Sequence, residues 1–296
     1  LLGVAPKALT EGELIADLNL LLDWAESRDL RISADFNRAF AENLDGLLGL
    51  MVSEGIVTRY DEGPEVVYGI ALEQHPVASY YRNTIIHFFV NKAIIELALL
   101  KASEVEGDVS LDLFWDEVDE LRDLFKFEFF YAPTEEFHEQ IRTELGRYSD
   151  DWEASVAQGP AGFGQLLEKM QPLVAHVTLQ TYAEAYSVVA GLAARSGPEA
   201  SLEEQECVDQ ALAYGRQLYL QRRISSESSI GKLLFKNGYR MLKSRRLTEQ
   251  PDPPDPELAP LGERRLQQSR QIRELLQRLG VIQAIANSTR TSAQGE

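Results

Sequence analysis

The four histidines are the first candidates for acid–base or nucleophilic chemistry, and no catalytic motif surrounds them. A serine or cysteine nucleophile needs a histidine and an orienting acid beside it. No Gly-x-Ser-x-Gly segment marks such a serine. The single cysteine, Cys207, follows a stretch in which three of four residues are glutamate, and these carboxylates are expected to raise the pKa of its thiol. The sequence therefore predicts no catalytic residue in this chain.

Metal and cofactor chemistry has equally little support. Glu135 and His138 have the Glu-x-x-His spacing of di-iron carboxylate proteins, but such a site requires the motif twice, and no second copy exists. The sequence contains neither a Walker A loop nor a Gly-x-Gly-x-x-Gly loop. One cysteine also excludes an internal disulfide framework and a cysteine-rich metal site. We therefore expect no metal and no cofactor.

One cluster of polar and aromatic residues has the composition of a binding site. Residues 79–89 read Ser-Tyr-Tyr-Arg-Asn-Thr-Ile-Ile-His-Phe-Phe, where residues 80–100 predict one long apolar helix. A helix N-terminus also favours an anion. Two interpretations stay open: a satisfied polar network in the core, or a substrate pocket or domain interface. The candidates for the second interpretation are Tyr81, Arg82, Asn83 and His87.

The formal net charge of −18 is unevenly distributed along the chain. Residues 1–215 contain 14 Lys and Arg against 39 Asp and Glu, a net of −25, whereas residues 216–280 contain 14 against 7, a net of +7. The basic segment packs on the acidic body, forms solvated helix faces, or contacts anionic lipid, which attracts each nearby basic residue by ~1 kcal/mol. The membrane-contact candidates are Arg222, Arg223, Lys232, Lys236, Arg240, Lys243, Arg245 and Arg246.

The N-terminal part predicts two helices and a β-hairpin, the outline of a winged helix. Thr10 and Glu13 have capping-box spacing at the start of the first helix, while Ser33 is expected to begin the second and Gly55 to end it. Two short strands are expected on either side of a turn at residues 61–65. Winged helices often bind DNA, but an acidic surface cannot neutralise phosphates. Nucleic acid is therefore not an expected partner.

The rest of the chain predicts a helical bundle, so the expected fold class is mainly α. One of its helices is expected to span residues 161–194. The most apolar stretches, 84–102 and 172–194, contain too many polar residues for a transmembrane helix. The expected domains are a winged-helix-like subdomain (1–74), a helical bundle (75–246), a Pro-rich linker (247–260), a C-terminal helix (261–287) and a disordered tail (288–296).

Three segments resemble, in the same order, segments of the large bacterial membrane-bound glycerol-3-phosphate 1-O-acyltransferases. The first is residues 79–89; the second, residues 124–130, reads Leu-Phe-Lys-Phe-Glu-Phe-Phe; the third, residues 232–237, reads Lys-Leu-Leu-Phe-Lys-Asn. The resemblance implies acyl transfer from acyl-CoA or acyl carrier protein to sn-glycerol 3-phosphate, the first step of phospholipid synthesis.

The chain departs from this family at the catalytic motif, His-x-x-x-x-Asp, in which the histidine is the general base. The residues five positions after the four histidines are Tyr80, Lys92, Thr143 and Thr181. The resemblance therefore implies a non-catalytic C-terminal region that braces an N-terminal catalytic domain of the same parent chain, at the cytoplasmic face of the cell membrane. The absence of an initiator methionine agrees with this expectation. The alternatives are a non-enzymatic winged-helix and helical-bundle adaptor, or a peripheral membrane-binding module.

Overall fold

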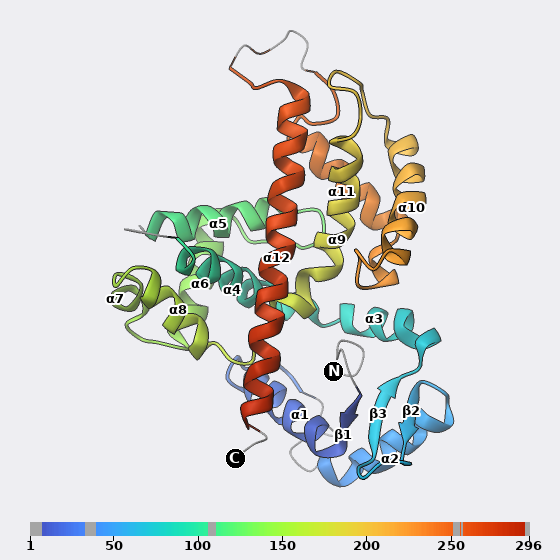
Figure 1. Cartoon of the computed structure of the whole chain (residues 1–296). Helices are drawn as coiled ribbons and strands as arrows, with labels where there is room; N and C mark the ends of the chain where they lie inside the picture. Colours follow the sequence, from blue (N-terminus) through green and yellow to red (C-terminus); the bar gives the residue numbers. More distant parts are fainter. Residues whose placement is uncertain (1–7, 33–39, 106–110, 251–254, 256, 294–296) are drawn as a thin grey trace. The chain divides into compact units, whose positions relative to one another are not determined.

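The computed structural model describes the chain except for residues 1–7, 33–39, 106–110, 251–254, 256 and 294–296. The described residues are mainly helical, with a small antiparallel sheet near the N-terminus, which confirms the expected fold class (Figure 1). The chain divides into two compact units, Leu1–Ile85 and Ile86–Glu296. Each unit has a hydrophobic core of its own.

Unit 1 combines a small sheet with short helices. Its elements are β1 (Leu9–Thr10), α1 (Glu11–Glu26), α2 (Phe40–Ser53), β2 (Val57–Tyr60), β3 (Val67–Ile70), the 3₁₀ turn η1 (Leu72–Gln74) and α3 (His75–Asn83). The predicted hairpin is confirmed, since β2 pairs antiparallel with β3. The short strand β1 pairs with the other edge of β3, a contact that the sequence pattern did not indicate.

The ends of the helices in unit 1 follow local sequence signals. The capping box of α1 is confirmed, because the Glu13 N–H donates to the Thr10 hydroxyl at 3.2 Å and the Thr10 N–H donates to the Glu13 carboxylate at 2.7 Å. Gly55 follows helix α2 and has a φ of 68°, a left-handed conformation that causes little strain in glycine because it has no Cβ. The expected cap Ser33 lies outside the described residues.

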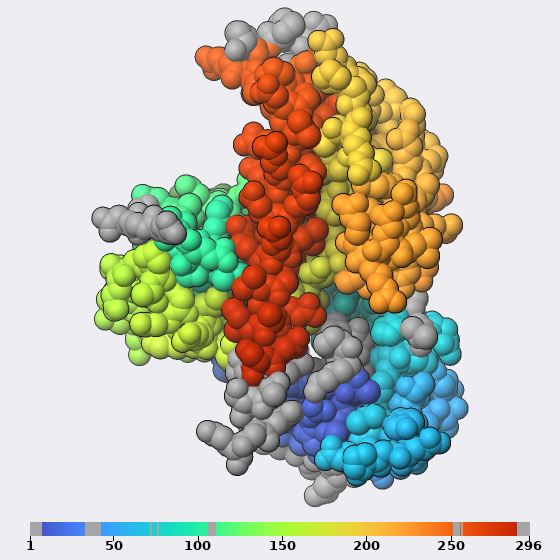
Figure 2. Space-filling view, in the orientation of Figure 1, coloured from blue at the N-terminus to red at the C-terminus, as the bar shows by residue number. Residues whose placement is uncertain are grey.

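Unit 2 is helical throughout its regular elements. These are η2 (Ile86–Phe89), α4 (Val90–Ser103), α5 (Leu111–Leu124), α6 (Thr134–Gly146), α7 (Trp152–Val156), α8 (Pro160–Lys169), α9 (Ala175–Ala193), α10 (Glu204–Leu220), η3 (Glu227–Ser229), α11 (Lys232–Ser244) and α12 (Leu261–Ala293). Most side chains of α4 and α9 are buried, so these two helices form the centre of the core. Helix α12 packs along α9 and extends beyond residue 287, where the C-terminal helix was expected to end. Its outer side is uncovered (Figure 2).

The prediction of one helix over residues 80–100 is wrong, because the helix is interrupted between α3 and α4. After Asn83 the backbone tightens: the Ile85 N–H donates to the Arg82 carbonyl at 3.1 Å, three residues back. The Thr84 hydroxyl donates to the Tyr81 carbonyl at 2.7 Å and thus competes with the helical backbone bonds. The interruption coincides with the boundary between the two units.

The prediction of one helix over residues 161–194 is also wrong, because α8 ends at Lys169 and α9 begins at Ala175. Pro172 lacks the N–H that a continuous helix needs. The start of α9 is instead capped by Glu96 of α4, which accepts from the N–H groups of Val174 at 2.9 Å and Ala175 at 2.7 Å. A side chain distant in sequence therefore determines where this helix begins.

Candidate functional site

The four candidates for a substrate pocket or domain interface are divided between the two units. Tyr81, Arg82 and Asn83 form the end of α3 in unit 1, whereas His87 lies in η2 of unit 2. The Arg82 Nε and Nη2 groups both donate to the Asn83 Oδ1 at 3.4 Å. The His87 ring lies 4.0 Å from the ring of Phe88. The structure thus brings Arg82 and Asn83 together, whereas His87 belongs to the other unit.

Large apolar side chains on and just after α3 face solvent. Tyr80 and Tyr81 are 69% and 67% exposed, and their rings meet edge to face at 5.7 Å. Val77 and Ile85 are also exposed. Val77 and Tyr81 lie one turn apart on the same side of the helix. We call Val77, Tyr80, Tyr81 and Ile85 the α3 surface, and a concentration of exposed apolar groups of this kind is typical of a contact surface.

The predicted membrane-contact residues fall into different environments. Arg245 is 16% exposed and pairs with Glu120 at 2.7 Å and Asp123 at 2.9 Å. Lys236 lies 3.9 Å from Glu204, at the limit of an ion pair. The remaining six face solvent: Arg222, Arg223, Lys232, Arg240, Lys243 and Arg246.

Arg245 connects three helices rather than facing a partner. It donates to the Gln268 Oε1 at 2.8 Å as well as to the two carboxylates of α5, so it ties α11 to α5 and α12. Burial raises the pKa of the Asp123 carboxyl, but hydrogen bonds from Lys126 and Arg245 outweigh burial and hold this pKa below its usual value. Arg245, one of the predicted membrane-contact residues, is therefore held by ion pairs within the chain.

The exposed basic residues lie between α10 and α11, on α11 and just after it, and these two helices are antiparallel. Near the start of α10, the Leu202 N–H donates to the Thr248 carbonyl at 2.8 Å, just beyond the end of α11. The Tyr239 hydroxyl of α11 also donates to the Leu202 carbonyl at 2.8 Å. The opposite ends of the two helices, the end of α10 and the start of α11, therefore lie together.

A buried carboxylate of α9 holds the segment between α10 and α11. Glu184 is 3% exposed and accepts from the Ser225 N–H at 2.9 Å and the Ser229 hydroxyl at 2.6 Å. Gln180 donates to the same carboxylate at 2.9 Å. Sequence reasoning missed this role, because the partners lie 41 and 45 positions away. The available signal was an acidic residue in an otherwise apolar helix.

Two of the three segments that carry the family resemblance meet in space. The Asn237 Nδ2 of α11 donates to the Glu128 Oε2 at 3.2 Å, joining the third segment to the second. Arg240 donates to the Asn237 Oδ1 at 3.3 Å. Burial raises the pKa of the Glu128 carboxyl, although the hydrogen bond from Asn237 favours its ionised form. The contact pairs residues that lie 109 positions apart.

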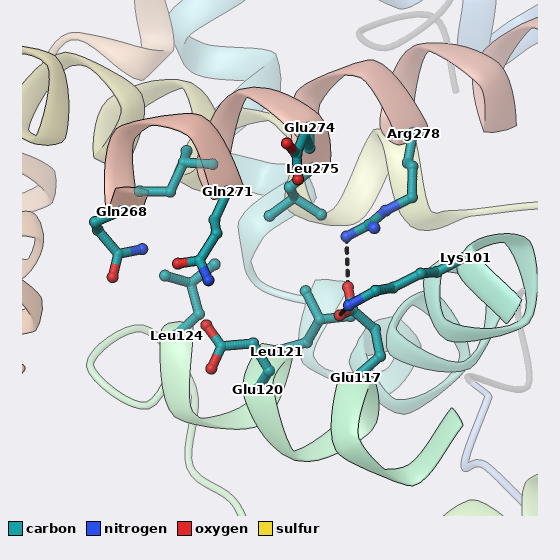
Figure 3. Close-up of a pocket in the computed structure, with 11 residues that line it drawn as sticks. Lys101, Glu117, Glu120, Leu121, Leu124, Gln268, Gln271, Glu274, Leu275 and Arg278 are labelled. Atoms are coloured by element: carbon teal, nitrogen blue, oxygen red, sulfur yellow. Dashed lines mark hydrogen bonds and ion pairs between the residues drawn. The ribbon is translucent and has the colours of Figure 1, made fainter. Parts of the chain in front are cut away.

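A small polar pocket lies between α4, α5 and α12 (Figure 3). Glu117 of α5 is buried there, and its two carboxylate oxygens pair with Lys101 and Arg278, each at 2.5 Å. The pocket has a volume of ≈ 60 Å³, which is room for a few water molecules. Both of its cations are therefore engaged with one buried carboxylate.

His138 and Cys207 are the residues whose types could have supported metal or thiol chemistry. The His138 Nε2 lies 2.8 Å from the Asp119 Oδ1, and its ring lies 4.6 Å from that of Trp115. Among the described residues, no group of three or more His, Cys, Asp and Glu could hold a metal ion. Burial, more than the neighbouring Glu206, raises the pKa of the Cys207 thiol to about 11. This confirms the expected direction of the shift and favours the unreactive thiol.

Comparisons with known proteins identify the family. The family described as "Glycerol-3-phosphate acyltransferase C-terminal region" matches residues 1–250. Relatives from Mycobacterium bovis and Mycobacterium tuberculosis, which carry the name acyltransferase plsB1, are 34% identical over 288 residues. The alignments cover 97% of this chain but 45% of each relative, so the chain spans less than half the length of these proteins. Across the described residues, no helix combines the length and apolarity needed to cross a membrane. The chain belongs to the glycerol-3-phosphate acyltransferase family and corresponds to its C-terminal region.

Proposed function

We propose that this chain is the C-terminal part of a glycerol-3-phosphate 1-O-acyltransferase and braces a catalytic half of the same protein. The parent enzyme would transfer an acyl group from acyl-CoA or acyl carrier protein to sn-glycerol 3-phosphate. The observation that carries the proposal is the family match over residues 1–250. Because no His-x-x-x-x-Asp occurs in the 296 residues, the general base would come from the other half. The family match favours this function over that of a non-enzymatic adaptor.

The α3 surface supports a bracing role. It presents two exposed tyrosines beside Arg82 and Asn83, which is the mixture of aromatic and Arg side chains enriched where proteins contact one another. We propose that this surface contacts the catalytic half and that Arg82 helps to shape the substrate pocket there.

The experiment compares the isolated chain with the longer protein that includes the sequence encoded upstream of Leu1. Acyl transfer from acyl-CoA to glycerol 3-phosphate is measured for both. We expect activity only in the longer protein, because the chain has no acid–base motif of its own. Turnover by the purified 296-residue chain would refute the non-catalytic role.

A substitution in the longer protein tests the contact at α3. We expect Arg82→Ala to lower kcat/KM at least tenfold, because a lost charged contact at an interface costs about 2 kcal/mol or more. Arg59→Ala is the matched control: this arginine is also in unit 1, and its side chain is 44% exposed. Equal kinetics for the two variants would remove Arg82 from the proposed contact.

A location at the cytoplasmic face of the cell membrane is a further part of the proposal. The supporting observation is the set of solvent-facing basic residues between α10 and α11, on α11 and just after it. Acidic phospholipid would then be the second partner of the chain, beside the catalytic half. Such contact would be peripheral, through charge and exposed apolar groups rather than a spanning helix.

A further inference from the structure

Two leucines protrude at the end where α10 stops and α11 starts. Leu220 is 82% exposed and Leu233 is 69% exposed, although fully exposing such side chains forgoes about 1.5–3 kcal/mol each. Arg222 and Arg223 follow the first leucine, and Lys232 precedes the second. We call these five residues the α10–α11 tip.

The tip lies in the most basic part of the sequence. Residues 210–248 contain nine Lys and Arg but one acidic residue, Glu227. The chain as a whole carries a net charge of −18. Three of these nine, Arg222, Arg223 and Lys232, lie at the tip, and a local excess of positive charge attracts anionic surfaces.

The cations of the tip are available, whereas several other basic residues of unit 2 are engaged within the fold. Arg245 and Arg278 pair with buried or half-buried carboxylates, and Arg265 donates to backbone carbonyls. Within the part of the chain that the structure describes, neither Arg222 nor Lys232 has an ion-pair partner, and both face solvent. Their charges are therefore free to meet an external anion.

The part of the tip that follows α10 is a hydrogen-bonded turn. The Arg222 N–H donates to the Tyr219 carbonyl and the Arg223 N–H to the Leu218 carbonyl, both at 2.8 Å. Arg222 has a φ of 56°, a left-handed conformation that is uncommon for a residue with a Cβ. Glu184 anchors the following segment through Ser225 and Ser229. The leucines are thus held outward by a defined backbone, which lowers the entropy lost when they bind.

The combination of groups distinguishes between anionic partners. Nucleic acid would use the arginines and the lysine but offers no apolar phase for two protruding leucines. An anionic bilayer offers both, because phosphates lie at its surface and hydrocarbon lies about 5–10 Å below. Basic residues around exposed leucines are the composition of segments that lie in this interface.

We propose that the α10–α11 tip is a lipid-insertion site, in which Leu220 and Leu233 enter an anionic leaflet and Arg222, Arg223 and Lys232 bind its phosphates. The site rests on the membrane location proposed above but not on acyl transfer. It assigns the membrane contact to one end of the α10–α11 pair, whereas Arg240, Lys243 and Arg246 would act only through their long-range electrostatic attraction.

Vesicle flotation of the 296-residue chain tests the site, with vesicles of phosphatidylcholine alone and of phosphatidylcholine with phosphatidylglycerol. We expect wild type to float only with the anionic vesicles and to be released by high salt, which screens the attraction. Leu220→Asp with Leu233→Asp, and separately Arg222→Glu with Lys232→Glu, should each weaken binding at least about tenfold. Thermal unfolding checks that both variants are folded.

Matched controls lie on α12, where Leu266 is 44% exposed and Arg270 and Arg273 face solvent. Leu266→Asp, and Arg270→Glu with Arg273→Glu, should float like wild type. Equal losses of vesicle binding in the tip and control variants would contradict the proposed insertion site but not the proposed membrane location. A wild-type chain that does not float overturns both, and the acyl-transfer measurement remains a separate test. Retention on immobilised poly-glutamate without flotation would identify an acidic protein as the partner and overturn the lipid site.

Discussion

The buried charges of unit 2 and the exposed charges of the α10–α11 tip use the same residue types in opposite ways. Lys92 and Glu96 are 1% and 0% exposed and pair at 3.0 Å, and Glu96 also caps α9. Arg265 is 1% exposed and donates to the carbonyls of Leu247 and Ala200, both at 2.8 Å. A charge withdrawn from water must be paired, so these residues are committed to the fold. The tip cations remain hydrated and can bind a partner.

The largest expected effect is the removal of a buried partner, which tests the first half of this comparison. Glu96→Ala leaves Lys92 buried without its carboxylate and exposes the N–H groups at the start of α9, so we expect a loss of about 3–5 kcal/mol in the free energy of unfolding. Urea denaturation measures it. Glu139→Ala is the control, since Glu139 is 70% exposed and should change stability by less than about 0.5 kcal/mol. A loss below about 1 kcal/mol for Glu96→Ala would contradict the capping role.

An intermediate effect, dependent on pH, is expected at Glu128. Burial raises the pKa of its carboxyl above 4.5 in the folded state, so the folded chain binds a proton more readily than the unfolded chain. The carboxyl therefore stabilises the fold at low pH, and this contribution falls as the pH rises from about 4.5 through the raised pKa. Relative to wild type, Glu128→Gln should become increasingly more stable over that window. Unfolding curves from pH 4 to 8 check this, and a constant difference would contradict the shift.

The smallest expected effects compare two basic residues of the same segment, Lys243 and Arg245. Arg245→Ala removes hydrogen bonds to Glu120, Asp123 and Gln268, and because the two carboxylates are 44% exposed we expect a loss of about 1 kcal/mol. Lys243→Ala should change stability by less than about 0.5 kcal/mol, because this side chain faces solvent. Thermal unfolding of both variants in one buffer measures the difference. Equal values would show that Arg245 is as dispensable to the fold as a surface lysine.

Local features of the fold were predictable because their partners are close in sequence. The capping box joins Thr10 to Glu13, and the hairpin joins strands separated by a short turn. The mainly helical class follows from apolar periodicity, which is also local. The family was recognisable from three short segments, and the match over residues 1–250 confirms it.

One error, the single helix over residues 161–194, occurred where a distant group takes part in the outcome. Apolar periodicity continues through residues 161–194, but the helix is interrupted between α8 and α9. Glu96, which caps the start of α9, lies 79 positions away in the sequence. The candidate site shows the same limit: the basic segment was visible in the sequence, but the internal pairing of Arg245 was not. Its partners lie 125 and 122 positions away on α5.

The sequence by itself determined the helical class, the small N-terminal hairpin, the uneven charge and the resemblance to the acyltransferase family, because each depends on composition or on neighbouring residues. The tertiary structure decided which side chain caps the start of α9, which carboxylates are buried, and which cations are committed or available. These outcomes depend on burial and on partners far along the chain, and no local pattern contains that information.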